Sequence, residues 1–385
     1  MNFRGSDVQN AIYVSGECPW PISSEAWEQA AQEKLDPGAF GYIVGGAGGE
    51  STVRANLEAF ERRKIRPRML TGNVERDLSV EVLGTPSPAP FFLAPIGVLS
   101  IAHEEGELAV ARAAASLGIP MILSGAASHS LEEVADAMGD APRWFQLYWV
   151  NDREIVASLV ARAAAAGYRA IVVTLDTLAL GWRPRDLAKA YLPFLSGQGC
   201  AQFFSDPVFC SRLERPPEED VLTAAATMLA GYPNLGLTWD DLAWLRERTD
   251  LPLLVKGVLR ADDAERARDA GIDGVVVSNH GGRQVDGAVA ALDALVEVRE
   301  ALGAEATVLM DGGIRRGADV IKALALGADA VLVGRPYAYG LAVGGQEGVE
   351  QVLTQLWAET DVTLALAGGR SVRELDRAFL AGSAV

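Results

Sequence analysis

The sequence of 385 residues is poor in cysteine, in histidine and in positive charge. Its three cysteines form no CxxC pair, so they indicate neither a disulfide framework nor a zinc site. Lys and Arg number 34 against 51 Asp and Glu, which gives a net charge of −17. A chain this acidic lacks the basic surface that nucleic acids and anionic membranes require. We therefore expect no metal centre, no nucleic-acid partner and no membrane partner.

Long hydrophobic runs are absent as well. No apolar run approaches the roughly 20 residues of a membrane span, and the first twenty residues lack the basic and apolar segments of a secretory signal. We expect a soluble, cytoplasmic protein. Hydrophobic residues nevertheless make up 49% of the chain, which is ample for a large core.

Short apolar or β-branched runs recur along the chain. They do not alternate with polar residues, as expected for strands buried on both faces, and Ala-, Glu- and Arg-rich helical stretches separate most of them. Their usual spacing of about 22 to 33 residues is the length of a βα repeat. The pattern predicts an α/β fold, a (β/α)8 TIM barrel, with an open doubly wound sheet as the alternative. The predicted strands are 91–93, 121–123, 144–147, 171–173, 253–255, 275–277, 307–309 and 330–332.

Two segments fall outside this repeat. Residues 1–80 form an N-terminal extension, helical at 24–35, that we expect to pack on a barrel spanning residues 81–385. The fourth and fifth strands are farther apart in the sequence than the usual βα spacing, and the extra residues are about 182–237. We interpret it as a long loop over the carboxyl-terminal mouth of the barrel, with Thr238 capping the next helix. Such loops usually shape the active site; a disordered or subunit-contact insertion is the alternative.

Nearly every predicted strand ends in a polar group, where barrel enzymes carry their reactive side chains. After the last two strands, glycines allow backbone N–H groups to approach phosphate oxygens, and Arg315 and Arg335 supply forked, charged donors. We therefore expect a phosphorylated ligand. The strand-end residues are Pro95, Ile96, Gly97, Ser124, Gln146, Tyr148, Thr174, Asp176, Lys256, Ser278, His280, Arg283, Asp311, Gly313, Arg315, Gly334 and Arg335.

His280 is one of only three histidines, and it follows the sixth strand, three residues before Arg283. A neutral imidazole there can accept a proton, the arginine can hold a carboxylate, and Asp176 can orient the ring. Lys256 can stabilise negative charge on an electron-rich ring. His103 and His129 have no such setting.

The segment 278–284, Ser-Asn-His-Gly-Gly-Arg-Gln, resembles the signature of the FMN-dependent family that oxidises 2-hydroxy acids, and the likeness extends over about residues 24–376. The resemblance implies that His280 is the base and that Tyr42, Tyr148, Arg183 and Arg283 hold the substrate. It implies FMN as the cofactor. The implied flavin contacts are Gly97, Ser124, Gln146, Thr174, Lys256 and Ser278, and the implied phosphate contacts are Gly313, Arg315, Gly334 and Arg335.

Within that family, residues 181–186, 193–195 and 206–209, together with Gly97, are most similar to lactate 2-monooxygenase. The resemblance implies oxidation of a small L-2-hydroxy acid by O2, followed by decarboxylation to a shorter acid, CO2 and water. A simple oxidase releasing the 2-oxo acid and H2O2, a dehydrogenase with another electron acceptor, and a barrel that only binds a phosphorylated metabolite are the alternatives. We also expect a homotetramer or a higher homo-oligomer.

Two positions depart from the family pattern. Ala126 stands where relatives carry a larger side chain near the substrate's side-chain end, and Trp149-Val150 follows Tyr148 where relatives are often Tyr-rich or carry proline. We expect the pocket to accept a side chain larger than the methyl group of lactate, unless Trp149 or the long loop refills the space.

Overall fold

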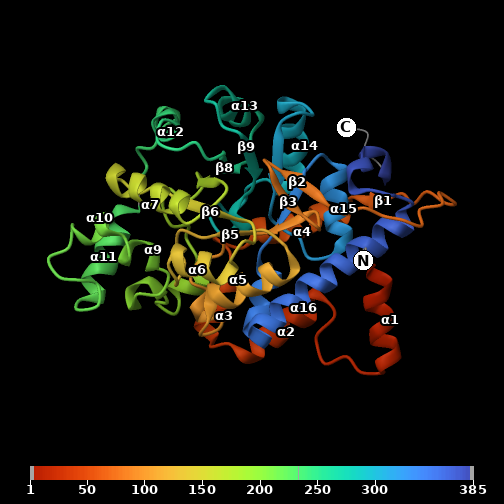
Figure 1. Cartoon of the computed structure of the whole chain (residues 1–385), viewed down its shortest axis with the longest axis horizontal. Coiled ribbons are helices and arrows are strands. Elements are labelled where there is room, and N and C mark those ends of the chain that lie inside the picture. Colours follow the sequence, from red (N-terminus) through yellow and green to blue (C-terminus); the bar gives the residue numbers. More distant parts are fainter. Residues whose placement is uncertain (1–3, 233, 382–385) are drawn as a thin grey trace.

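The computed structural model describes residues 4–232 and 234–381. Within these residues, eight parallel strands pair side by side into a closed barrel, as the sequence predicts (Figure 1). The strand side chains are almost all buried, which explains why the sequence runs are apolar without alternation. In barrel order, the strands are β4 (Phe91–Leu93), β5 (Met121–Leu123), β6 (Arg143–Tyr148), β7 (Ile171–Thr174), β8 (Leu253–Val258), β9 (Gly274–Val277), β10 (Thr307–Met310) and β11 (Ala330–Val333).

A helix follows each barrel strand along the chain, often after a short connecting loop. The last of these, α16, is long and is interrupted by non-helical backbone at Gly344 and Gly345. Thr238 caps its helix through a capping box with Asp241, as expected. The helices are α5 (Gly106–Leu117), α6 (Leu131–Met138), α7 (Arg153–Ala165), α12 (Trp239–Arg246), α13 (Ala261–Asp269), α14 (Ala291–Leu302), α15 (Gly317–Ala325) and α16 (Arg335–Ala367).

The segment before the barrel is helical at 24–34, as predicted, and it contains further helices that the sequence did not reveal. Trp27 lies against α16, where its indole Nε1 donates to Gln355 Oε1 at 2.9 Å. The boundary at residue 80 stays a prediction. The helices of this segment are α1 (Gly5–Ser15), α2 (Ser24–Lys34), α3 (Pro37–Val44) and α4 (Ser51–Arg62).

Two small antiparallel pairings lie outside the barrel. The hairpin of β2 (Val80–Val82) and β3 (Thr85–Ser87) packs against the start of β6, where Trp144 Nε1 donates to Thr85 Oγ1 at 2.9 Å. Strand β1 (Lys64–Ile65) pairs with β12 (Leu380–Ala381) and ties the segment that follows α4 to the carboxyl-terminal end of the described chain. Such two- and three-residue strands are too short for a periodic sequence signal.

The excess between β7 and β8 is not an irregular loop. It folds into short helices, α8 (Pro184–Leu187), α9 (Ala201–Phe204), α10 (Pro207–Cys210) and α11 (Val221–Gly231), with a 3-10 turn at Pro193–Ser196. We call residues 182–237 the insert. The four-residue helices are shorter than the window in which helical periodicity can be recognised, which is why the sequence predicted a loop.

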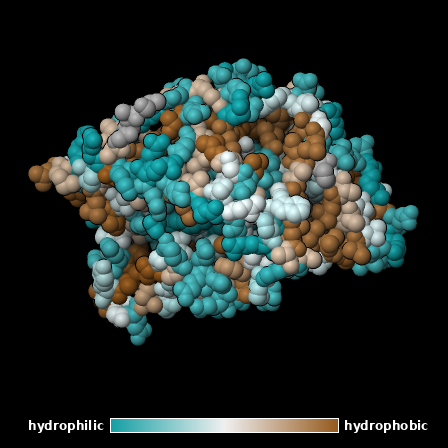
Figure 2. Space-filling view, turned by 180° about the vertical axis from the view of Figure 1, so that it is seen from behind, coloured by the Kyte–Doolittle hydropathy of each residue, from teal (hydrophilic) through white to brown (hydrophobic). Residues whose placement is uncertain are grey.

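No helix among the described residues is long and apolar enough to cross a membrane. The surface is largely hydrophilic but is interrupted by apolar areas, one of them on the projecting edge that carries loop 66–76 (Figures 1 and 2). Met69, Leu70 and Val74 in this loop are exposed, and Leu70 has a positive φ of 55°.

Candidate active site

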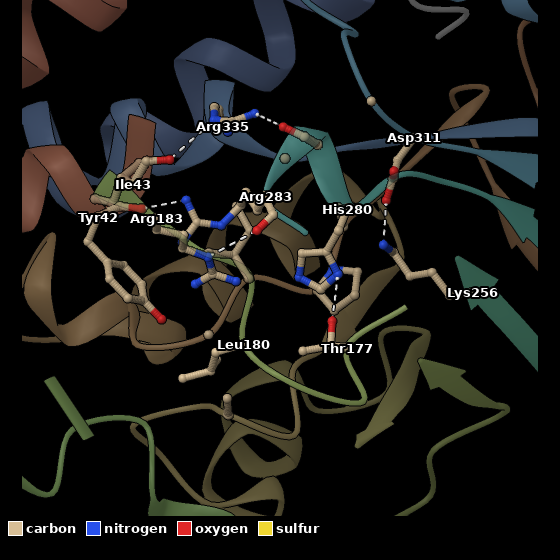
Figure 3. A pocket seen from close by; sticks show the side chains of 18 of the residues that line it. Tyr42, Ile43, Thr177, Leu180, Arg183, Lys256, His280, Arg283, Asp311 and Arg335 are labelled. Atoms are coloured by element: carbon tan, nitrogen blue, oxygen red, sulfur yellow. Dashed lines mark hydrogen bonds and ion pairs between the residues drawn. The ribbon is translucent and has the colours of Figure 1, made fainter. Parts of the chain in front are cut away.

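A cavity of about 310 Å³ opens where the barrel strands end (Figure 3). Its walls come from the loops after these strands, from the end of α3 and from the insert. The chain thus brings together polar groups that are far apart in the sequence. Predicted site residues that line the cavity are Tyr42, Pro95, Ile96, Gly97, Tyr148, Arg183, Lys256, His280, Arg283, Asp311, Gly313, Arg315, Gly334 and Arg335.

The other predicted site residues do not line the cavity; they lie at the same strand ends, and most are fully buried. Gln146 Oε1 accepts from Ser124 Oγ at 3.2 Å and from the Gly125 N–H at 3.1 Å. Gln146 Nε2 and Thr174 Oγ1 are buried without a hydrogen-bond partner among the described residues. Because an unmade buried hydrogen bond is costly, these two atoms indicate polar contacts that a ligand would supply. The residues of this group are Ser124, Gln146, Thr174, Asp176 and Ser278.

His280 lies in a strained turn and pairs with Asp176. Its φ of 57° is in the left-handed region, where strain often marks a functional site, and its backbone N–H donates to Ser278 Oγ. His280 Nδ1 lies 2.8 Å from Asp176 Oδ1. Since an ionised carboxylate can only accept, Nδ1 carries the proton and Nε2 is left as an acceptor.

The charges around this pair set its protonation. Burial lowers the pKa of His280, with Lys256 and Arg183 adding to the effect, and these outweigh the opposing influence of Asp176. Burial alone would raise the pKa of Asp176, but the neighbouring His280 and Lys256 hold it below the usual value. The pair is therefore a neutral imidazole beside a carboxylate near pH 7.

Arg183 and Arg283 meet in the cavity. Arg183 donates from Nε to the Arg283 carbonyl oxygen at 3.2 Å and from Nη2 to Gln284 Oε1 at 2.9 Å. Burial, and then the charge of Arg183, lower the pKa of Arg283 to about 9. Two cations held this close in a buried site favour the binding of an anion between or beside them.

The carboxyl-terminal end of α3 holds two of the arginines. Arg283 Nη1 donates to the carbonyl oxygens of Tyr42 and Gly45, at 2.6 and 2.8 Å. Arg335 donates to Ile43 and Gly45 of the same helix end, and also to the Gly281 carbonyl oxygen at 3.0 Å. A helix end with unpaired carbonyls and a partial negative charge is a natural site for cations.

Lys256 is buried at the end of β8. Its Nζ lies 2.9 Å from both Asp311 Oδ2 and Ser278 Oγ, and Ser278 Oγ donates to Asp311 Oδ1 at 2.6 Å. Burial disfavours the ammonium charge, but Asp311 and Asp176 outweigh it and raise the pKa of Lys256. The lysine is thus a permanently charged group in the wall of the cavity.

The loop after β10 comes very close to α4. Gly313 has a φ of 96°, and a Cβ there would lie 2.8 Å from the carbonyl oxygen of Asn56. Asn56 and Asn279 exchange side-chain hydrogen bonds, both of 2.8 Å, which pins α4 against the His280 turn. Only glycine fits this approach, and it leaves the backbone beside Arg315 and Arg335 open to a phosphate group.

Sequence reasoning missed part of the cavity wall. Thr177 lines the cavity and follows the predicted strand-end residue Asp176. Its position so near a strand end was the sequence feature that could have identified it as a site residue. The apolar residues of the insert had no local signal, because they face the cavity only after the insert has folded over the barrel. Those that line the cavity are Leu192, Phe194, Leu229 and, next to its end, Tyr232, with Leu180 just before it.

Trp149 does not refill the space at Ala126. It is buried against Trp244, with ring centroids 5.7 Å apart, and does not line the cavity. Ala126 does line the cavity. Its backbone also explains why residue 97 is a glycine, because a Cβ on residue 97 would lie 2.7 Å from the Ala126 carbonyl oxygen. Leu180, Leu192 and Phe194 are among the apolar groups that share this cavity with Ala126.

A closed barrel with a proton acceptor, paired arginines and a glycine–arginine phosphate site at one mouth defines a barrel enzyme with a phosphorylated cofactor. The family described as FMN-dependent dehydrogenase matches residues 31–382, and the chain belongs to this family. It is therefore an FMN-dependent oxidoreductase.

Relatives of known name agree with this assignment. The chain is 43% identical to L-lactate oxidase from Lysinibacillus sphaericus (strain C3-41), over 94% of this chain and 93% of that protein. It is 42% identical to 2-hydroxyacid oxidase 1 from Homo sapiens, over 94% and 97% of the two chains. A crystal structure of mandelate oxidase superposes with a TM-score of 0.83 at 40% identity, covering 94% of this chain and 98% of that chain.

The residues of this site match the groups that FMN presents. The unpartnered Gln146 Nε2 and Thr174 Oγ1 are donors of the kind that a flavin ring's carbonyl oxygens and ring nitrogens require. The glycine approach at Gly313, with Arg315 and Arg335 beside it, matches a phosphate monoester.

Proposed function

We propose that this chain oxidises a small L-2-hydroxy acid with FMN as cofactor and O2 as electron acceptor, and that it acts as a monooxygenase of the lactate 2-monooxygenase type. The observation that carries the proposal is that His280, which is paired with Asp176, lines the same cavity as Arg183 and Arg283. The names of the relatives, L-lactate oxidase and 2-hydroxyacid oxidase, support the substrate class.

Arg183 and Arg283 bind the substrate carboxylate. Arg283 donates from Nη1 to carbonyl oxygens at the end of α3. No other nitrogen of its guanidinium has a hydrogen bond to the described residues. Nη1 of Arg183 likewise makes no hydrogen bond to the described residues, so it is available to a substrate carboxylate. A carboxylate there relieves the repulsion between the two cations, and Tyr42 and Tyr148 border the same space.

His280 is the base. With Nδ1 donating to Asp176, Nε2 accepts the proton of the substrate hydroxyl, or the α-proton in a carbanion path. Asp176 then stabilises the imidazolium that forms. When bound, FMN supplies the two-electron acceptor for the substrate's α-carbon. Gly313, Gly334, Arg315 and Arg335 would hold its phosphate, and Gln146, Thr174, Lys256 and Ser278 would hold its ring.

The insert supports the monooxygenase outcome. It lines the cavity with apolar side chains such as Phe194 and Leu229, and an apolar wall over the site would slow the exchange of a bound product with water. A 2-oxo acid that stays bound meets the H2O2 formed from O2. The two react to the carboxylic acid one carbon shorter, CO2 and water, which balances all atoms.

The decisive experiment measures O2 uptake, H2O2 and CO2 together over a panel of 2-hydroxy acids. One CO2 per O2 with little free H2O2 is expected. One H2O2 per O2 without CO2 would instead make the chain a simple oxidase, and substrate oxidation that needs an added electron acceptor would make it a dehydrogenase. Denaturation of the purified yellow protein should release FMN and no FAD; a colourless protein that binds none would overturn the proposal.

The remaining expectations from the sequence stay predictions. They are the cytoplasmic location and the homotetramer or higher homo-oligomer. Exposed Met69, Leu70 and Val74 are side chains of the kind that a subunit contact buries, which supports the second of these.

A further inference from the structure

The Asp176 carboxylate is held very unevenly. Oδ1 lies 2.8 Å from His280 Nδ1 and accepts from Thr177 Oγ1 at 2.9 Å. Oδ2 is buried and has no hydrogen-bond partner anywhere in residues 4–232 and 234–381. Since only one oxygen is bonded, the orientation of the carboxylate depends on the few groups that touch it.

Thr177 touches both members of the His280–Asp176 pair. Its Oγ1 lies 3.1 Å from His280 Nδ1 (Figure 3). The same oxygen lies 2.9 Å from Asp176 Oδ1. The hydroxyl has one hydrogen, which goes to the carboxylate, so its lone pairs face the Nδ1–H. The ring N–H is therefore shared between two acceptors, Asp176 Oδ1 and Thr177 Oγ1.

Gly257 closes the other side of Asp176. Strand β8 shifts register at this residue, its φ is 108°, and a Cβ would lie 2.6 Å from Asp176 Cβ and 2.8 Å from Oδ2. The backbone therefore packs against Oδ2 without bonding it. This leaves the Thr177 hydroxyl as the only side-chain donor to the Asp176 carboxylate, apart from His280, among the described residues.

We propose that Thr177 is a positioning residue. Its hydroxyl keeps Asp176 and the imidazole of His280 aligned for proton transfer. The inference rests on the proposed role of His280 as the base. It assigns the residue a task separate from substrate binding, because Arg183 and Arg283 make no hydrogen bond to Thr177.

Two substitutions separate the hydroxyl from the shape of the side chain. Thr177→Val keeps the shape and removes the hydroxyl, whereas Thr177→Ser keeps the hydroxyl and removes the methyl group. The holoenzyme of each is mixed anaerobically with L-lactate and with 2-hydroxyisocaproate, and the rate constant of flavin bleaching and the substrate Kd are measured from pH 5 to pH 9.

The valine variant should lose about tenfold or more in the bleaching rate constant at pH 7, the usual contribution of one hydrogen bond to a charged group. Its substrate Kd should stay within about twofold, since the arginines are untouched. Asp176, having lost a donor to its charged form, becomes a stronger partner for the imidazolium. The pKa of His280 should therefore rise, and the acid limb of the profile should move to higher pH, with Lys256 and Arg183 unchanged around it. The serine variant should match the parent.

A second measurement does not depend on turnover. Because the chain has only three histidines, protein labelled with 15N at histidine gives a resolvable set of ring signals. In the parent, the His280 ring should carry its proton on Nδ1 near pH 8, and the valine variant should titrate at higher pH than the parent.

Several results would overturn the inference. A valine variant with the parent's rate and pH profile would remove any role of the hydroxyl. Equal losses in the valine and serine variants, or a Kd that rises as the rate falls, would indicate packing alone. If His280→Ala still bleached the flavin at the parent's rate, the assignment of His280 as the base would be wrong. If His280→Ala were inactive and Thr177→Val behaved as the parent, only the role of Thr177 would be wrong.

Discussion

Arg283 and Arg335 donate to the same oxygen, the Gly45 carbonyl, at 2.8 and 2.9 Å. The shared acceptor fixes the spacing between the proposed carboxylate clamp and the proposed phosphate clamp. Burial, with other arginines adding to it, lowers the pKa of both groups. The site therefore has an excess of positive charge that two anionic groups, a substrate carboxylate and a phosphate, would balance, although the chain as a whole is strongly acidic.

Arg283→Lys should weaken substrate binding even though it keeps the charge. A lysine cannot both donate to the end of α3 and present a fork to a carboxylate. We expect the Kd for a 2-hydroxy acid, measured by anaerobic titration, to rise by about 10- to 100-fold, the range for a lost charge-assisted hydrogen bond. Arg260→Lys, at an exposed pair with Asp262, is the matched control. An unchanged Kd in the Arg283 variant would show that this residue does not hold the carboxylate.

His280→Ala should abolish flavin reduction by substrate while FMN stays bound, because none of the proposed phosphate contacts involves the imidazole. General-base catalysis contributes about 10²–10⁴-fold, and we expect a loss of at least this size in the anaerobic rate constant. His103→Gln, at a histidine that lies outside the cavity wall, is the control and should behave as the parent. A near-normal rate in the alanine variant would take the proton-transfer role away from His280.

The pH dependence of flavin reduction follows from the direction of the His280 pKa. The base must be neutral to accept a proton, and burial lowers its pKa below 6.5, so the neutral form predominates at pH 7. The rate constant should be level around neutral pH and should fall as the pH drops through the lowered pKa. Stopped-flow measurements from pH 5 to pH 8 test this, and an acid limb centred above pH 6.5 would contradict it.

Ala126 should let the pocket accept substrates larger than lactate. Each CH2 that the substrate buries against Leu192 and Phe194 contributes about 0.8 kcal/mol, so two or three carbons shift the preference by about tenfold or more. The measurement compares kcat/KM for lactate, 2-hydroxybutyrate, 2-hydroxyisocaproate and mandelate. Ala126→Leu should move the preference back toward lactate, while Ala11→Leu, on the exposed side of α1, should leave it unchanged. If the parent prefers lactate strongly and the leucine variant keeps the same ranking, the pocket is shaped elsewhere.

His129 should stabilise the fold in a pH-dependent way. It lies 3.0 Å from the fully buried Glu107, whose hydrogen bond raises the pKa of His129 above 6.5, with Glu105 and Glu133 nearby. A raised folded-state pKa gives stability that is fully present below pH 6.5 and is lost as the pH rises through the raised value. His129→Gln should cost about 1–3 kcal/mol of unfolding free energy at pH 6 and clearly less at pH 9. Urea unfolding at both pH values tests this; an equal cost at both would exclude an ionised His129.

Local patterns in the sequence carry the information that makes the barrel predictable. Each strand is a short apolar run at a regular spacing, and each strand end carries a polar group, so the places of His280, Lys256 and Arg315 follow from the repeat alone. The segment 278–284 has a pattern specific enough to indicate the family from seven consecutive residues.

Contacts between distant segments could only be decided by the tertiary structure. The carbonyl oxygens at the end of α3 hold Arg283 and Arg335, and Gly257 of β8 shapes the space for Asp176, but nothing near these residues in sequence announces the contact. The insert is the clearest case, because Phe194 and Leu229 look like any apolar residues of a helix or turn until the insert folds over the barrel. The sequence by itself therefore determined the barrel, its polar mouth and the chemistry it can carry. The tertiary structure alone decided which backbone atoms orient the charged groups and which apolar side chains line the pocket, since such contacts depend on chain segments meeting in space and have no period along the chain.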